Sequence, residues 1–196
     1  MKLFNFDEFP VLETRRLHLR EILTQDAEAI FAIRSDYEVT RLNTGAAYTD
    51  MYQAHDLIDG MRRCYRERTE LRWGVTLKPD DTVIGMIGYN YWNRQDRRAS
   101  VGFDLLRAQW RKGIMSEALQ VVLRFGFEHM NLNRIEADCS ADNVASAGLL
   151  KKVGFQQEGV QRQQYHEGGV FYDLMLFGLL RREWIAAQTS RKNKFV

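Results

Sequence analysis

Residues 105–118 read Leu105-Leu106-Arg107-Ala108-Gln109-Trp110-Arg111-Lys112-Gly113-Ile114-Met115-Ser116-Glu117-Ala118, and this stretch leads from an apolar strand directly into a helix. The first N–H groups of a helix have no intrahelical partner, and the helix dipole adds partial positive charge at that end. Arg111 and Lys112 lie beside this end, and Gly113 allows a ligand to approach the backbone closely. The junction therefore predicts a site for a phosphate or pyrophosphate group. It contains neither Gly-x-Gly-x-x-Gly nor Gly-Lys-Ser/Thr, so a dinucleotide fingerprint and a Walker loop do not fit.

The totals of the 196-residue chain predict one α/β domain over residues 1–196 with a full hydrophobic core. With 45% hydrophobic and 28% charged residues, the composition is typical of a globular protein and not of a disordered or membrane-spanning one. A net charge of +2 gives no argument for nucleic acid or an anionic membrane as a partner. We expect a monomer or a homodimer.

The N-terminal segment and the cysteines lead us to expect a cytoplasmic protein without a metal. Residues 1–8 contain no apolar segment of signal-peptide length. Cys64 and Cys139 lack Cys-x-x-Cys spacing, so buried free thiols in a reducing compartment are expected. The histidines are scattered without the spacing of metal ligands: His18, His55, His129 and His166.

Hydrophobic periodicity predicts alternating strands and helices. Strands are expected over 17–22, 72–77, 83–91, 98–105, 134–139, 157–163 and 171–179, and helices over 24–34, 55–68, 114–128 and 143–153. The strands between 72 and 105 would form an antiparallel meander, residues 98–154 a parallel crossover unit, and the last two strands a closing hairpin. Residues 35–51 are expected to be irregular. Residues 1–10 and 186–196 would be tails, with 191–194 disordered.

Four motifs resemble the GNAT superfamily of N-acetyltransferases. Trp110-Arg111-Lys112-Gly113-Ile114-Met115 is similar to its pyrophosphate loop, Arg/Gln-x-x-Gly-x-Gly/Ala, and the Trp, Met and following Ser-Glu-Ala resemble the RimJ/RimL branch that acetylates ribosomal proteins. Residues 143–155, with Asn143, Ser146 and Gly154-Phe155, resemble the family's Asn-x-x-Ser helix. The segments 12–20 and 168–173 are similar to its first strand and its closing hairpin. The resemblance covers roughly residues 12–180, and the four motifs together are far more specific than any one of them.

The resemblance implies a mixed, mostly antiparallel sheet that is splayed in the middle and flanked by helices, with acetyl-CoA in the gap as the acyl donor. The pantetheine would lie along Asp104, Leu105 and Leu106, and Asn143 would hold the cofactor arm from the other side. The implied pyrophosphate site consists of Arg111, Lys112, Gly113, Ile114, Met115 and Ser116.

The implied reaction is direct attack of an amine on the thioester in a ternary complex, which needs a proton acceptor and a proton donor. The family's two carboxylates align with Ser100 and Tyr165, so the general base stays open, with His166, Glu167 and Asp104 as candidates to accept the proton or orient the amine. We expect Ser146 or Tyr165 to donate the proton to the thiolate. An α-amine with a pKa near ~8 is about a tenth neutral at pH 7, so a protein N-terminus, as in ribosomal proteins, is the preferred acceptor.

Three alternatives stay open. The acceptor could be a small-molecule amine such as a polyamine or an aminoglycoside. A silent acyl-CoA-binding module would keep the phosphate loop and lose the acid and the base. Asn143 could be only a helix cap. Under the preferred hypothesis, the segment 35–52 and the closing hairpin select the acceptor.

Overall fold

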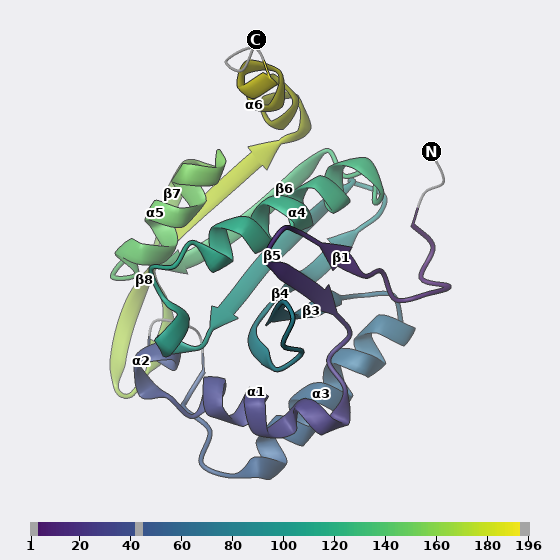
Figure 1. Ribbon diagram of the computed structural model, residues 1–196. Coiled ribbons are helices and arrows are strands. Elements are labelled where there is room, and N and C mark those ends of the chain that lie inside the picture. Colours follow the sequence, from purple (N-terminus) through teal and green to yellow (C-terminus); the bar gives the residue numbers. More distant parts are fainter. Residues whose placement is uncertain (1–3, 42–44, 193–196) are drawn as a thin grey trace.

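The computed structural model describes residues 4–41 and 45–192, and within these residues the strands form one sheet (Figure 1). The strands are β1 (Leu12–Glu13), β2 (Leu17–Arg20), β3 (Leu71–Leu77), β4 (Val83–Asn93), β5 (Arg98–Leu105), β6 (Arg134–Ser140), β7 (Gln156–Glu167) and β8 (Val170–Leu180). The helices are η1 (Thr24–Asp26), α1 (Ala27–Arg34), α2 (Tyr37–Thr40), α3 (Met51–Arg66), η2 (Arg107–Gln109), α4 (Ile114–Glu128), α5 (Val144–Val153) and α6 (Arg181–Lys192), of which η1 and η2 are 3₁₀ turns. None of the helices described is long and apolar enough to cross a membrane.

The sheet has eight described strands in the order β1-β2-β3-β4-β5-β6-β8-β7. Every neighbouring pair is antiparallel except β5 and β6, which are parallel and are joined through α4. The meander, the crossover unit and the closing hairpin predicted from the sequence are therefore confirmed. β7 and β8 are longer than predicted, because the alternation that marks a half-buried strand is lost where the hairpin is exposed on both faces.

The sheet opens between its two parallel strands. β5 and β6 pair only over three positions, of which the last joins Ser100 and Glu136. Beyond these residues β5 stays paired to β4 as far as Leu105, and β6 stays paired to β8 as far as Ser140. The two halves of the sheet thus diverge, which confirms the splayed sheet that was expected.

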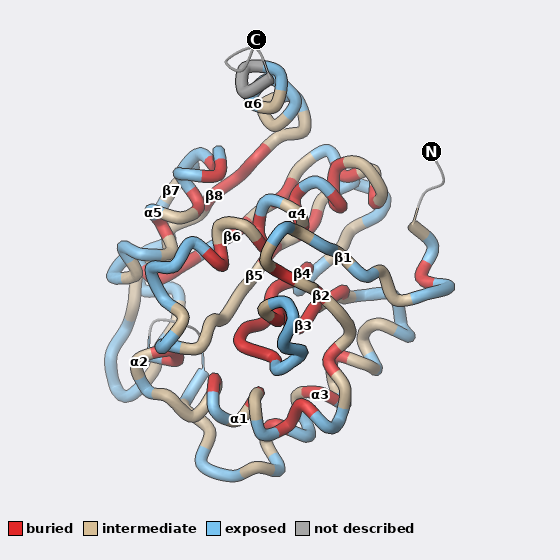
Figure 2. The backbone as a smooth tube through the Cα atoms, viewed as in Figure 1, coloured by how far each residue is buried: buried red, intermediate tan, exposed pale blue. Residues whose placement is uncertain are grey.

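Each face of the sheet carries its own hydrophobic core. The larger core contains the apolar side of α4 with Leu119 and Val122 at 0% exposure, together with Tyr89 and Ile135 from the strands. The smaller core joins α1 and α3 to the other face of β4. Figure 1 shows α1 and α3 together on one side and α4 across the other, and Figure 2 shows the buried residues concentrated along the central strands and α4.

Both chain ends differ from the tails that we predicted. Residues 4–10 cover the edge of the larger core, where Phe6 is 7% exposed and stacks on Trp92 at 5.3 Å between ring centroids. The Trp73 Nε1 group donates a 2.6 Å hydrogen bond to the Pro10 carbonyl. At the other end α6 continues to Lys192, and Trp184 packs on Phe127. Aromatic side chains thus anchor both segments. Residues 193 and 194 of the stretch predicted to be disordered lie outside the described residues.

The helices in the N-terminal third of the chain begin at residues that differ from the predicted ones. Thr24 starts a 3₁₀ turn and not the α-helix, which begins at Ala27. α3 begins at Met51, because Asp50 and Gln53 form a capping box. The segment predicted to be irregular contains the short helix α2, capped by the Asp36 side chain. Cys139 is a buried free thiol as expected, whereas Cys64 is only half-buried.

Candidate active site

The loop before α4 has the backbone of an anion site. Gly113 is the N-cap and has φ 74°, in the left-handed region that favours glycine, and Arg111 also has a positive φ of 60°. No side chain caps this helix, so its first N–H groups are free of a side-chain acceptor. They are available to an anion at the positive end of the helix dipole.

Contacts from the first strands hold this loop in place. Arg16 donates from Nη1 to the Lys112 carbonyl at 3.1 Å and forms an ion pair with Glu117 at 2.7 Å. Glu117 also accepts a hydrogen bond from the Thr14 hydroxyl at 2.5 Å. Burial raises the pKa of Glu117, but the hydrogen bonds with Thr14 and Arg16 together outweigh this and lower it. Glu117 therefore stays charged at the end of the helix where a negative charge is favourable.

A cavity of about 430 Å³ begins at this loop and runs between β5 and α5. Nine of the residues that we predicted for the site line it: Asp104, Leu105, Arg111, Gly113, Ile114, Met115, Ser116, Asn143 and Ser146. We call it the donor cavity. It is large enough for part of a long, narrow ligand whose phosphate end lies at Gly113.

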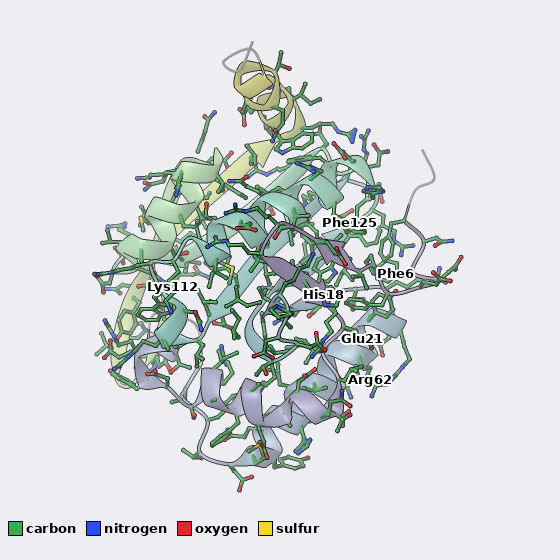
Figure 3. All side chains as sticks on the ribbon, viewed as in Figure 1. Phe6, His18, Glu21, Arg62, Lys112 and Phe125 are labelled. Atoms are coloured by element: carbon green, nitrogen blue, oxygen red, sulfur yellow. The ribbon has the colours of Figure 1, made fainter. Side chains whose placement is uncertain are left out.

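Two predicted cofactor residues lie outside the donor cavity. The Leu106 N–H is bonded to the Ile84 carbonyl at 2.8 Å and its side chain packs on the α1–α3 core, so it is not free for a ligand. Lys112, labelled in Figure 3, lies on the loop that leads into α4, and its Nζ contacts the Gln109 side chain at 3.1 Å. Its charge is near the site, but its side chain does not line it.

A second cavity of about 260 Å³ lies on the sheet face that carries α1 and α3. We call it the acceptor cavity. It shares Phe103, Asp104 and Ser146 with the donor cavity, so the two meet where β5 and β6 diverge. Arg34 from α1 reaches into it and forms a 3.2 Å ion pair with Asp104. This pair lies beside the opening, because Asp104 lines both cavities.

One of the two predicted proton donors lies at this opening, and the other lies on its acceptor side. Ser146 lines both cavities, whereas Tyr165 on β7 lines only the acceptor cavity. The Tyr165 ring stacks on Tyr172 at 5.0 Å, and its buried hydroxyl has no hydrogen-bond partner among the described residues. A buried phenol without a partner is costly, so this hydroxyl is available to a ligand.

Asn143 combines the two roles that the sequence left open. Its Oδ1 accepts a 3.0 Å hydrogen bond from the Ser146 N–H, which makes it the N-cap of α5. The same residue lines the donor cavity. Burial raises the pKa of the Cys139 thiol, and the nearby Ser146 side chain lowers it by less.

The structure adds a carboxylate that sequence reasoning missed. Asp138 on β6 lines the acceptor cavity, whereas Ser100, where the family pattern suggested a carboxylate, lines neither cavity. Asp138 is accessible from the cavity, yet the surrounding walls desolvate its carboxyl and raise its pKa. A charged residue at every second position of Arg134-Ile135-Glu136-Ala137-Asp138 is typical of a solvent-facing side of a strand. Only the position of Asp138 beyond the last β5–β6 pair distinguishes it from the other two. Within the described residues no cluster of His, Cys, Asp or Glu could hold a metal ion.

A sheet splayed between two parallel strands, with a phosphate loop on one side of the gap and a second cavity on the other, defines a group-transfer enzyme that uses a nucleotide-bearing donor. The family model for the acetyltransferase (GNAT) domain matches residues 16–156, and the chain belongs to this family of N-acetyltransferases.

Related proteins support the assignment. The chain is 40% identical over 173 residues to the uncharacterized N-acetyltransferase YoaA of Bacillus subtilis (strain 168). The aligned residues make up 88% of this chain and 98% of that protein. It is 28% identical over 121 residues to the [ribosomal protein uS5]-alanine N-acetyltransferase of Escherichia coli, and these residues make up 61% of this chain and 62% of that protein. The crystal structure of a GNAT acetyltransferase from Bacillus anthracis has the same fold, with a TM-score of 0.79 and 23% identity over 89% of this chain and 100% of that one.

Proposed function

We propose that this enzyme moves the acetyl group of acetyl-CoA to a protein N-terminal α-amine by direct attack in a ternary complex. The observation that carries the proposal is the meeting of the donor and acceptor cavities at Phe103, Asp104 and Ser146. A thioester in one cavity and an amine in the other would meet at this opening. Holding two reactants in contact removes much of the entropic barrier of a bimolecular reaction.

The donor cavity fits acetyl-CoA. The pyrophosphate would be held by the backbone of Arg111, Gly113, Ile114 and Met115, with the Ser116 hydroxyl as a further donor. The pantetheine would follow Asp104 and Leu105 on the edge of β5 that β6 no longer covers. Asn143 would approach the arm from α5. The bound thioester is the activated acyl group, and the protein residues position it.

In the transfer step the neutral amine nitrogen bonds to the thioester carbonyl carbon, the C–S bond breaks, the nitrogen loses one proton, and the thiolate takes up a proton. Ser146 supports the role of proton donor because it lines both cavities, and Tyr165 supports it through its unpartnered hydroxyl. A thiol has an ordinary pKa near ~8.5, so the thiolate is a fairly good leaving group. The donors therefore assist the reaction and are not an absolute requirement for it.

The size of the acceptor cavity favours a chain terminus over a larger molecule. Its volume of about 260 Å³ lies below the ~300–1,000 Å³ that is typical for drug-sized ligands. A terminal residue can enter such a cavity while the rest of its chain stays outside. One relative carries the name of a ribosomal-protein alanine N-acetyltransferase, which agrees with this class of acceptor. A polyamine, whose thin chain also fits, is the second candidate.

A panel of acceptors tests the proposal. Peptides that begin with Ala or Ser, a polyamine and an aminoglycoside are compared by release of free CoA from acetyl-CoA. We expect the peptides to be acetylated with the highest kcat/KM. Turnover of only the polyamine or the aminoglycoside would instead establish a small-molecule acetyltransferase. The further parts of the proposal are a cytoplasmic location, a monomer or homodimer, and no nucleic acid or membrane as partner.

A further inference from the structure

Four charged side chains line the acceptor cavity: Arg34, Arg72, Asp104 and Asp138. Arg34 is paired with Asp104 at 3.2 Å, and Arg72 is paired with Glu70 at 2.9 Å. Asp138 has no ion pair or hydrogen bond from its side chain to any residue in the described part of the chain. The cavity therefore presents one carboxylate that lacks a cation of its own.

The position of Asp138 follows from the register of β6. Ala137 and Cys139 face the core under α4, so Asp138 between them faces the opposite side of the sheet, where the acceptor cavity lies. It follows Glu136, the last residue of β6 that pairs with β5, by two positions. Asp138 thus lies on the acceptor side of the opening, past the point where the strands part.

A carboxylate in a partly desolvated wall is unfavourable unless a positive group reaches it. The acceptor of the proposed reaction arrives as an ammonium ion and can supply that charge. On the basis of the proposed function, we propose that Asp138 binds the acceptor's ammonium group and removes its proton before the attack on the thioester.

The proton and electron balance of the step is complete. The Asp138 carboxylate takes one proton from the ammonium ion, which frees the nitrogen lone pair. The lone pair forms the C–N bond, the C–S electrons leave with sulfur, and the thiolate receives a proton from Ser146 or Tyr165. The nitrogen then gives up the second proton that the amide does not keep, and this proton restores Ser146 or Tyr165. After release of the amide product, Asp138 returns its proton to water, and no other reactant is needed.

Several groups surround Asp138 and influence its charge. The titratable and charged groups that line the same cavity are Arg34 of α1, Arg72 of β3, Asp104 of β5, Cys139 of β6 and Tyr165 of β7, of which Cys139 has its side chain in the core under α4. The two arginines are already paired with carboxylates, so they compensate Asp138 only weakly. Burial raises the pKa of Asp138, and an incoming ammonium ion should lower it again.

The sign of the effect on stability follows from linkage. A carboxyl whose folded pKa is raised stabilises the fold only in its protonated form, below its unfolded value, and loses that contribution as the pH rises through the folded value. At pH 7 the ionised Asp138 is therefore unfavourable to folding. The isosteric, neutral side chain of Asn removes this effect, so Asp138→Asn should raise the Tm at pH 7, and the difference from wild type should disappear in acid.

The test compares wild type, Asp138→Asn, Asp138→Glu and the control Asp59→Asn, which changes an exposed residue of α3 outside both cavities. We expect Asp138→Asn to lower kcat/KM for a peptide acceptor by ~10²- to 10⁴-fold and to lose the limb of the pH profile that rises with ionisation of Asp138. Its rate should then follow only the titration of the amine. Asp138→Glu should restore part of the activity, the control should match wild type, and all four should bind CoA equally by thermal shift.

The outcomes separate this inference from the proposed function. If wild type acetylates the peptide and Asp138→Asn does so with the same kcat/KM and pH profile, the role of Asp138 is refuted and the function stands. If wild type binds CoA and transfers acetyl to no amine, both are refuted. A variant that loses activity together with CoA binding and thermal stability would show that Asp138 is structural, which also overturns the inference.

Discussion

At the scale of single residues, the proposed pyrophosphate site depends on the left-handed backbone of Gly113. A Cβ added there would meet only Arg16 Nη2, at 3.6 Å, so the neighbouring protein atoms do not forbid a side chain. What matters is the φ of 74° and the space that the phosphate needs. Asn and Asp are the non-glycine residues that tolerate this region best, and they have nearly the same size.

We therefore predict a difference between Gly113→Asp and Gly113→Asn that reports charge alone. A carboxylate ~4 Å from a phosphate charge costs about 1–4 kcal/mol, depending on exposure to water. Gly113→Asp should lose the thermal stabilisation by CoA, whereas Gly113→Asn should keep part of it. Equal CoA-induced shifts in the Asp variant and wild type would show that the pyrophosphate binds elsewhere.

The two proposed proton donors give a second residue-scale prediction. Ser146→Ala and Tyr165→Phe should each lower kcat, within the ~10²- to 10⁴-fold range of general-acid effects, and leave CoA binding unchanged. Ser100→Ala is the matched control, because Ser100 lines neither cavity. Wild-type kcat in both single variants and in the double variant would leave water as the donor.

At the scale of elements, α4 packs on the sheet through a close contact between Gly126 and Tyr89. A Cβ on Gly126 would lie 2.1 Å from the Tyr89 hydroxyl oxygen, which is fully buried and donates a 2.8 Å hydrogen bond to the Val122 carbonyl. This contact brings α4 close to β4 in the core that supports the phosphate loop.

Gly126→Ala should destabilise the fold by about 1–3 kcal/mol, because overpacking outweighs the better helix propensity of alanine. In Gly60→Ala, the matched control in α3, the new Cβ meets nothing within 4 Å, so this variant should gain ~0.5–1 kcal/mol. Adding Tyr89→Phe to Gly126→Ala should recover part of the loss. Urea unfolding gives the free energy of unfolding of each variant. If the effects of Gly126→Ala and Tyr89→Phe on that free energy were purely additive, the contact between the two residues would be contradicted.

The elements that sequence could predict are those with clear periodicity. The bounds of β5 agree with the alternating pattern at 98–105, and the narrow polar side of α4 marked the buried helix. α6 was missed because it has few apolar residues to mark a buried side, although Trp184 anchors it. The N-terminal segment was missed because scattered phenylalanines show no periodicity, and their partners lie far away in sequence.

The residues of the candidate site also fall into a group that the sequence could predict and a group that it could not. The donor cavity was predictable because its residues lie in two continuous motifs, and the exceptions, Leu106 and Lys112, depend on which way each residue faces. The acceptor cavity collects Arg34, Arg72, Asp138 and Tyr165 from four distant elements. No local sequence pattern links these residues, so only the three-dimensional fold shows that they lie in one cavity.

At the scale of the whole molecule, the donor cavity and the acceptor cavity meet where the sheet is splayed. Arg16 ties the loop before α4 to the first strands. Away from this loop, the Glu21–Arg62 ion pair, labelled in Figure 3, joins α3 to the segment after β2, with 3.6 Å between Arg62 Nε and Glu21 Oε1. The proposed direct transfer needs both substrates bound at once, so we expect no acetylated enzyme intermediate.

The central claim is that acetyl passes from acetyl-CoA to an N-terminal amine through this opening, and one measurement tests it most directly. A peptide with a free N-terminal Ala and one internal Lys is incubated with enzyme and acetyl-CoA, and tandem mass spectrometry locates the acetyl group. Omission of enzyme, and a peptide with a blocked N-terminus, are the controls. We predict acetyl on the α-amine alone, whereas acetyl on the lysine, or on neither amine while a polyamine is acetylated, would contradict the account.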